Sequence, residues 1–96
     1  MSVTIESVLV RDASLSTADV DGRLVVLSLD RGTYIDLNGV ASEIWQMLSA
    51  PCRVGQIFDA LSQNHDVDIA ILSRDVMPFL QDLIDRRLAR QIEASR

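Results

Sequence analysis

Apolar positions along the chain follow two different periods, and the change between them divides the sequence into a strand half and a helix half. The first half has short runs rich in β-branched residues, at Val3–Val10, Arg23–Asp30 and Thr33–Leu37. Such runs, bounded by turn residues, are typical of strands. The second half has apolar residues at i, i+3, i+4 and i+7, the spacing of one buried helical stripe. The pattern predicts three strands followed by three helices.

The three predicted strands form an antiparallel meander. Asp21-Gly22 is a turn signal before the second strand, and Gly32 supplies the positive φ that a short hairpin to the third strand needs. The segment Arg11–Thr17 is polar and small, so we expect a loop there. Both faces of Arg23–Asp30 are apolar, which favours a strand paired on both sides. Thr33–Leu37 therefore lies at one edge of the predicted sheet.

Each predicted helix carries one apolar stripe. Asn38 is the expected N-cap of the first helix and Asp68 that of the third. The second helix is predicted from about Arg53 to Gln63, and the third ends near Leu88. The stripes consist of Ala41, Ile44, Trp45 and Leu48; of Val54, Ile57, Phe58 and Leu61; and of Leu72, Val76, Phe79, Leu80 and Leu83. This order predicts a single α+β domain over residues 1–96, winged-helix-like, with a three-stranded antiparallel sheet followed by three helices.

Composition supports one small core and indicates a cytoplasmic protein. The chain has 96 residues, of which 48% are apolar, enough for a single core. No apolar run approaches the ~18 residues that a membrane span requires. The N-terminus lacks a basic leader and a cleavable apolar segment, so we expect no signal peptide. The single cysteine, Cys52, excludes an internal disulfide and fits a reducing compartment.

The charge bears on the class of partner. The net charge is −5, and every basic residue is an arginine. Such a surface is a poor match to a phosphate backbone, whose binding depends on several cationic contacts, so we expect no nucleic-acid partner. A winged-helix DNA-binding regulator has the same architecture and stays an alternative. Its recognition helix should be cationic, whereas the second helix offers only Arg53, and Arg86, Arg87 and Arg90 come late in the third.

The side chains that carry out catalysis are sparse. The only cysteine and the only histidine, Cys52 and His65, lie in separate connections, where nucleophile–base pairs are rarely preorganised. A metal site needs three or four close ligands, and no nucleotide-binding motif is present. We therefore expect no enzyme activity, no cofactor and no metal. Asp75, Asp82 and Asp85 share one face of the third helix, which is either a solvated surface or a surface that favours basic peptide residues.

One run of residues resembles a known family. The run from Leu27 to Asn38, with Leu29, Asp30, Gly32, Tyr34 and Leu37, resembles the signature of PqqD-like proteins. The similarity continues through Ile44, Trp45 and Leu48, then Val54, Ile57 and Leu61, then Asp75, Val76, Phe79, Leu80 and Leu83. It covers about Val20 to Leu88, and its specificity comes from the order and spacing of these pieces. Two positions depart from the pattern: Val40-Ala41 replaces a Gly-containing pair, and Arg53 replaces a capping Thr or Ser.

The resemblance implies a function in peptide maturation. PqqD-like proteins are recognition elements for ribosomally made, modified peptides: they bind the leader segment of a precursor and present it to a processing enzyme. The short acidic chain is most similar to the free-standing members of lasso-peptide pathways. Their partner is a cysteine-protease-like leader peptidase. Other members are chaperones for a radical-SAM maturase, and a scaffold subunit that binds only enzymes is a further alternative.

The resemblance also implies where the peptide binds. In the family the leader adds as a strand to the edge of the third strand, against the third helix, which is β-augmentation. We expect an apolar cleft between Ile35 or Leu37 and the third helix. The expected peptide-binding residues are Thr33, Tyr34, Ile35, Asp36, Leu37, Asp75, Val76, Phe79, Leu80, Asp82 and Leu83.

Overall fold

The computed structural model describes residues 3–21, 23–28, 32–37 and 39–92. Over these residues the fold is α+β with three helices, as predicted. The strands are β1 (Val8–Arg11), β2 (Ser16–Val20), β3 (Arg23–Ser28), β4 (Thr33–Leu37), β5 (Cys52–Arg53) and β6 (Ala89–Ile92). The helices are α1 (Val40–Met47), α2 (Val54–His65) and α3 (Ile69–Asp85). The strands form two three-stranded antiparallel sheets, with orders β2-β3-β4 and β5-β1-β6.

The β2-β3-β4 sheet is a meander joined by two short turns. Val20 lies opposite Arg23 in the first hairpin, so its loop has two residues, and Asp21 adopts a positive φ of 53°. Gly32 has a φ of 65° in the second hairpin, which confirms the role expected for this glycine. Leu29, Asp30 and Arg31 lie outside the described residues.

The meander has one buried face and one partly exposed face. Leu24 and Val26 of β3 are buried, whereas Val25 and Leu27 are half-buried. This alternation is what a period of two residues produces when one face meets the core. The apolar residues on both faces of β3 therefore reflect its central position between β2 and β4.

The β5-β1-β6 sheet unites distant parts of the chain. β1 pairs with β5 and with β6, so that Val8 lies opposite both Arg53 and Ile92. The segment before β1 also closes the start of α2, because the backbone N–H groups of Val54 and Gly55 donate to the carbonyls of Ser7 and Ile5, each at 2.9 Å. These first-turn N–H groups have no partner inside the helix.

Two predictions about the N-terminal strands are wrong. The predicted strand Val3–Val10 is a strand only from Val8, and it belongs to the second sheet. Before it, the side chain of Ser7 accepts a hydrogen bond from the Thr4 N–H at 2.9 Å, a local bond that competes with strand pairing. The predicted loop Arg11–Thr17 already contains the start of β2, an edge strand whose residues are mostly exposed and therefore lack an apolar pattern.

The helices follow the prediction closely except at one end. Asp68 caps α3, since its side chain accepts from the Ala70 N–H at 3.2 Å. Asn38, the expected cap of α1, lies outside the described residues, and the N-cap position is occupied by Gly39. α3 ends at Asp85 and not near Leu88, which is buried beside β6 and not part of the helix.

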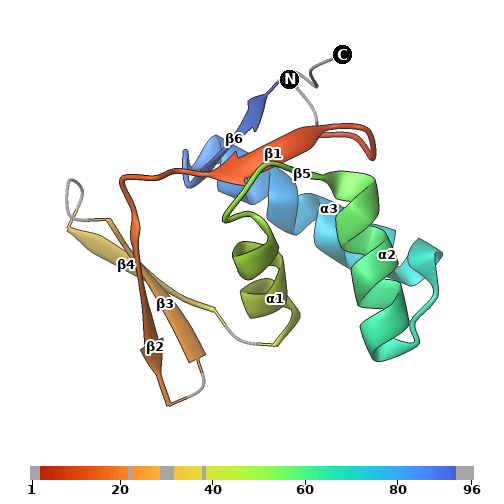
Figure 1. Ribbon diagram of the computed structural model, residues 1–96, viewed down its shortest axis with the longest axis horizontal. Helices are drawn as coiled ribbons and strands as arrows, with labels where there is room; N and C mark the ends of the chain where they lie inside the picture. The colour runs from red at the N-terminus through yellow and green to blue at the C-terminus, as the bar shows by residue number, and fades with distance from the viewer. Residues whose placement is uncertain (1–2, 22, 29–31, 38, 93–96) are drawn as a thin grey trace.

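The core lies between the two sheets and the three helices. Figure 1 shows α1 between the meander on one side and α2 on the other, with the second sheet along the top of the molecule. Trp45 of α1 is only 1% exposed, which confirms its predicted place in the core. Its indole Nε1 donates to the hydroxyl of Thr17 in β2 at 3.0 Å, and the guanidinium of Arg11 in β1 lies 5.5 Å from the ring centroid. The indole therefore contacts both sheets.

Candidate functional site

β4 is an edge strand of the meander. Within the described ranges it pairs with β3 alone, and no strand lies along its other side. An edge strand presents backbone N–H and C=O groups that are free to pair with another chain. β4 has five residues and no proline, so a guest strand of that length finds an uninterrupted ladder.

The side chains of β4 divide between the two faces of the meander. Tyr34 is 70% exposed, and Asp36 is exposed and pairs with Arg23, with 2.9 Å between Oδ2 and Nη1. Ile35 and Leu37 face the core, where Leu37 is buried. The inner side chains fix the position of the strand, while its outer side chains stay accessible. For Thr33 only the backbone is described, in β4.

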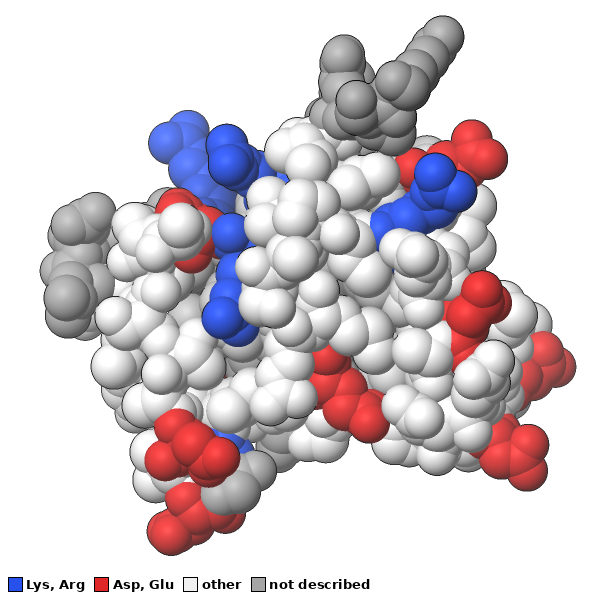
Figure 2. Space-filling view, in the orientation of Figure 1, with Lys and Arg blue, Asp and Glu red and all other residues white. Residues whose placement is uncertain are grey.

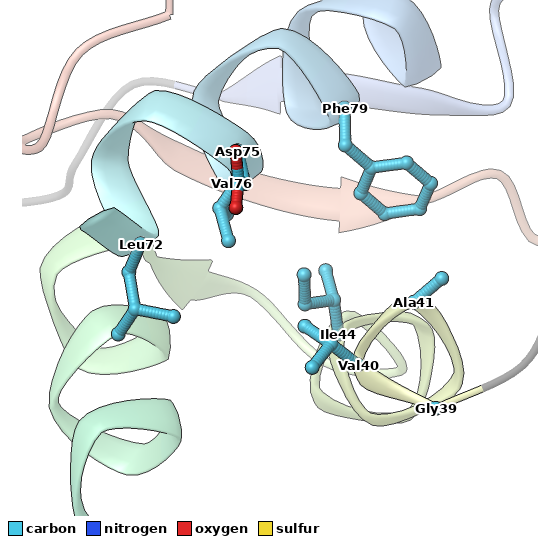
Figure 3. A pocket seen from close by; sticks show the side chains of 8 residues that line it. All are labelled: Gly39, Val40, Ala41, Ile44, Leu72, Asp75, Val76 and Phe79. Atoms are coloured by element: carbon cyan, nitrogen blue, oxygen red, sulfur yellow. The ribbon is translucent and has the colours of Figure 1, made fainter. Parts of the chain in front are cut away.

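A cavity of about 400 Å³ lies between α1 and the part of α3 from Leu72 to Phe79. Its lining residues are Gly39, Val40, Ala41, Ile44, Leu72, Asp75, Val76 and Phe79. We call it the α1–α3 cavity. Figure 3 shows the side chains of Leu72, Val76 and Phe79 extending from α3 toward α1. The cavity is apolar apart from Asp75, so it suits an apolar side chain with a polar or cationic neighbour.

The position of Gly39 links the edge strand to the α1–α3 cavity. Gly39 has a φ of 54° at the N-cap of α1, a backbone conformation that residues with a Cβ rarely adopt. An ideal Cβ built there meets no atom within 4 Å. The glycine is therefore required by the backbone turn and not by close packing. It turns the chain from β4 into α1 and forms one wall of the cavity.

The predicted residues of α3 separate into two groups. Val76 and Phe79 line the α1–α3 cavity, Val76 buried and Phe79 half-buried, and their contact with a peptide stays a prediction. Leu80 and Leu83, which were expected beside them, are buried in the core and do not line the cavity. Side chains of one helical stripe point in slightly different directions, and only those that face α1 line the cavity.

The three aspartates predicted on one face of α3, Asp75, Asp82 and Asp85, have different environments. Asp75 lines the α1–α3 cavity and is well exposed, with Arg74 at 3.8 Å, also exposed. Asp82 pairs with Arg86, with 3.2 Å between Oδ2 and Nε, and Asp85 accepts from the Gln81 side-chain amide at 3.1 Å. Exposed pairs such as these are worth little. Of the three carboxylates, Asp75 alone lines the cavity.

The apolar cavity is formed by α1 and α3, and not by β4 and α3 as expected. We expected Ile35 or Leu37 to form one wall, but neither lines the α1–α3 cavity, because Leu37 packs inward on the core. The wall is formed by the residues that follow β4, Gly39, Val40 and Ala41, together with Ile44. These residues and Leu72 were not predicted as site residues, because Ala41, Ile44 and Leu72 belong to the apolar stripes expected to pack in the core.

The candidate nucleophile and base are far apart. Cys52 precedes α2 and His65 is its last residue, so the length of the helix, about 18 Å, separates them. Burial raises the pKa of the Cys52 thiol, which keeps it protonated near neutral pH. His65 instead pairs with Glu43 of α1, with 2.5 Å between Nε2 and Oε2.

The described part of the chain has neither a cluster of metal ligands nor a membrane-spanning helix. There, no group of three or more His, Cys, Asp or Glu side chains is placed to hold a metal ion. None of the helices in the described ranges combines the length and apolar character needed to cross a bilayer. The open edge of β4 and the α1–α3 cavity next to it therefore form the candidate peptide-binding site.

Comparison with known proteins identifies the family. Residues 23–89 match the sequence profile described as "Coenzyme PQQ synthesis protein D (PqqD)". The chain belongs to the PqqD family. The match begins at β3 and ends at the start of β6, so it includes β4 and the α1–α3 cavity. The resemblance found in the sequence is thereby confirmed.

Two relatives with curated names support the assignment to the PqqD family. Both are called "PqqA binding protein" and come from Rhodopseudomonas palustris, one from strain ATCC BAA-98 / CGA009 and one from strain TIE-1. They are 40% and 36% identical to this chain over 86 residues, which are 90% of this chain and 82% of each relative.

A solved structure has the same fold as this PqqD-family chain. It is described as "TbiB1 in Complex with the TbiA(beta) Leader Peptide". The TM-score is 0.75 at 30% sequence identity, and the superposition covers 91% of this chain and 99% of the other. The α+β, PqqD-like fold expected from the sequence is therefore confirmed.

Proposed function

We propose that this PqqD-family protein is a non-catalytic adaptor that binds the leader segment of a ribosomally made precursor peptide. The leader adds as a strand to the open edge of β4 and anchors an apolar side chain in the α1–α3 cavity. The observation that carries the proposal is the position of this open edge directly before the cavity, in a chain similar to a protein solved with a leader peptide.

The two parts of the site have different energetic roles. Each ladder hydrogen bond adds only about 0.5–1.5 kcal/mol net, and five residues of β4 supply only a few of them. Ordering a flexible peptide costs a comparable amount. The surplus that gives useful affinity must therefore come from apolar burial in the α1–α3 cavity. Backbone pairing sets the direction of the leader, and the cavity sets its selectivity.

The partner that receives the precursor is a maturation enzyme. We favour a lasso-peptide type of pathway, in which a cysteine-protease-like leader peptidase receives the bound precursor, because the short acidic chain resembles the free-standing members of such pathways. The similarity to TbiB1, which was solved with a leader peptide, covers 91% of this chain and 99% of the TbiB1 chain. The names of the two curated relatives support a second candidate, a PqqD-type chaperone that presents PqqA to a radical-SAM maturase. Titration with the TbiA(beta) leader and with PqqA separates them, since the favoured pathway predicts tighter binding of the former.

Proline substitution tests strand addition. Ile35→Pro and Asp36→Pro are made in turn, because adjacent residues of a strand direct their N–H groups to opposite sides. At the position whose N–H faces outward, a proline removes a guest hydrogen bond and is tolerated by the edge strand. We expect leader affinity, measured by calorimetry, to fall at least about tenfold in that variant while circular dichroism stays native.

The control uses the other edge of the same sheet. Ala18→Pro and Asp19→Pro place the same substitution in β2, which pairs with β3 alone in the described ranges. A folded β2 variant should bind the leader like the unmodified protein. Undiminished binding in folded variants at both β4 positions contradicts strand addition at β4.

A further inference from the structure

A second groove lies at the C-terminal end of α3. It has a volume of about 580 Å³ and lies between the segment after β1 and the start of β6. Its lining residues are Asp12, Ala13, Ile84, Arg87, Ala89, Arg90 and Gln91. We call it the arginine groove. It shares no lining residue with the α1–α3 cavity, and Val76 and Ile84, one from each, are about 12 Å apart along the helix.

The arginine groove has an excess of positive charge. Arg87 and Arg90 are exposed, and neither has an ion-pair partner within 4.0 Å among the described residues. The neighbouring Arg86, in contrast, pairs with Asp82 at 3.2 Å. The carboxylate of Asp12 accepts from the backbone N–H and the hydroxyl of Ser14, each at 2.9 Å. Among the described residues that line the groove, two guanidinium groups without an ion-pair partner therefore outnumber one engaged carboxylate.

This positive region is unusual for an acidic protein. The chain has a net charge of −5. In Figure 2, arginine side chains gather near the end of α3 and the start of β6, at the upper left. Carboxylates predominate over α2 at the right and at the β2–β3 turn at the lower left. The arginine groove is therefore one place on this face where arginine side chains gather, although the molecule is acidic overall.

Arg87 has a left-handed backbone conformation that glycine adopts readily and arginine does not. α3 ends in a Schellman turn, in which Leu88 N–H donates to the Leu83 carbonyl at 2.9 Å and Arg87 N–H to that of Ile84 at 3.0 Å. This motif places Arg87 at a φ of 61°, where glycine is the usual residue. Fold stability does not explain an arginine at this position. A glycine here also offers a substitution that removes the charge without backbone strain.

The start of β6 indicates which class of macromolecule fits. β6 pairs with β1 alone over the part of the chain that is described, so its other side is an open strand edge. Ala89, Arg90 and Gln91 belong both to this strand and to the lining of the groove. A polypeptide can use such an edge through its own backbone, which a nucleic acid cannot. The net negative charge of the chain also disfavours a run of phosphates.

We propose that the arginine groove docks an acidic polypeptide segment of the enzyme that receives the precursor. Its carboxylates pair with Arg87 and Arg90, and its backbone lies along the edge of β6. The identity of the partner rests on the proposed function; the preference of the groove for an acidic polypeptide does not. The adaptor then holds the leader at one end of α3 and the enzyme at the other.

Two capped hexapeptides test the groove on the whole chain. One alternates glutamate with valine, and the control alternates lysine with valine. We expect the glutamate peptide to shift amide resonances of Asp12–Ala13 and of residues 84–91 in nuclear magnetic resonance titrations. The lysine peptide should leave these resonances unchanged. Absence of binding by the glutamate peptide, or shifts confined to β4 and the α1–α3 cavity, overturns the inference.

Arg87→Gly separates charge from folding. We expect affinity for the glutamate peptide to fall about fivefold, and about twentyfold when Arg90→Gln is added. The midpoint of thermal unfolding should stay equal or rise, because glycine is free of strain at this φ. Equal affinity in Arg87→Gly and the unmodified protein overturns the inference, and so does tighter binding of a short duplex DNA than of the glutamate peptide at the same salt concentration.

The same variants distinguish this inference from the proposed function. Arg87→Gly should bind the TbiA(beta) leader unchanged. A protein that binds the leader but not the glutamate peptide refutes the arginine groove as a docking site and leaves the adaptor function intact. A protein that binds the glutamate peptide but no leader supports the arginine groove as a docking site and contradicts the proposed adaptor function.

Discussion

The two sheets are built in opposite ways. β2, β3 and β4 are consecutive in the chain and pair through short turns. β5, β1 and β6 come from the middle and both ends of the described chain, and both of their pairings join residues that are far apart in sequence. The meander therefore depends on contacts between neighbouring segments, whereas the second sheet depends on contacts between residues far apart in the chain.

Both sheets leave an open edge beside a cavity, and the chemistry of the two cavities differs. β4 leads into the α1–α3 cavity, which is apolar and contains Asp75 as its only ionisable residue. β6 contributes to the arginine groove, which carries Arg87 and Arg90. Edge strands are usually protected against pairing with other chains. Among the described strands, β4 and β6 each combine an edge with the lining or approach of a cavity, which fits a molecule that holds two polypeptides at once.

Trp45→Ala has the largest expected effect, because it breaks the connection between the sheets. Trp45 is buried and contacts Arg11 of β1 and Thr17 of β2. Removing a buried aromatic side chain costs about 3–5 kcal/mol. We expect this loss in the free energy of unfolding, measured by urea denaturation.

Trp45→Phe is the matched control for the indole. It keeps most of the buried area and loses the hydrogen bond to Thr17, so a loss of about 1–2 kcal/mol is expected. If Trp45→Ala is no less stable than Trp45→Phe, the two sheets are not joined through this side chain.

Substitutions that fill one cavity or the other have an intermediate expected effect, measured as the change in leader affinity. Ala41→Leu adds bulk inside the α1–α3 cavity and should lower leader affinity about tenfold, since the added side chain occupies the space of the apolar anchor. Ala13→Leu adds the same bulk to the arginine groove, and leader affinity should not change. Calorimetry on both variants checks the pair. Equal losses contradict the assignment of the leader to one cavity.

The smallest effect concerns Cys52 in β5. Burial raises the pKa of this thiol above its ordinary value of 9.0. The stabilisation that accompanies a raised pKa is complete below pH 9.0 and is lost as pH rises through the folded-state pKa. Alkylation by iodoacetamide should therefore be slow at neutral pH and accelerate only in alkaline buffer. Rapid alkylation at neutral pH contradicts this environment for β5.

The difference between the two sheets also explains which parts of the fold the sequence could predict. The hairpin between β3 and β4 was predicted because its evidence is local: alternating residues, Gly32 and an adjacent helix. The strands β1, β5 and β6 have two to four residues each and are defined by partners distant in the chain. A segment as short as Cys52–Arg53 has no periodicity of its own, so only the tertiary structure makes it a strand.

The site was predictable to a similar extent. Asp75, Val76 and Phe79 were expected in it from the family resemblance, and all three line the α1–α3 cavity. Leu80 and Leu83 were expected as well, but they are buried, because a helical stripe does not reveal which of its members face an opening. Gly39 was not predicted as a site residue, although its positive φ turns the chain from β4 into α1 and places it in the wall of the cavity.

Hydrogen exchange on β4 tests the central claim most directly. The chain is compared with and without the TbiA(beta) leader, and each backbone amide of β2, β4 and β6 is followed separately. Strand addition predicts that outward-facing amides of β4 exchange at least about tenfold more slowly with the leader bound, while β2 and β6 amides keep their rates. Leader binding that leaves every β4 amide unprotected, or that protects β2 or β6 instead, contradicts the account.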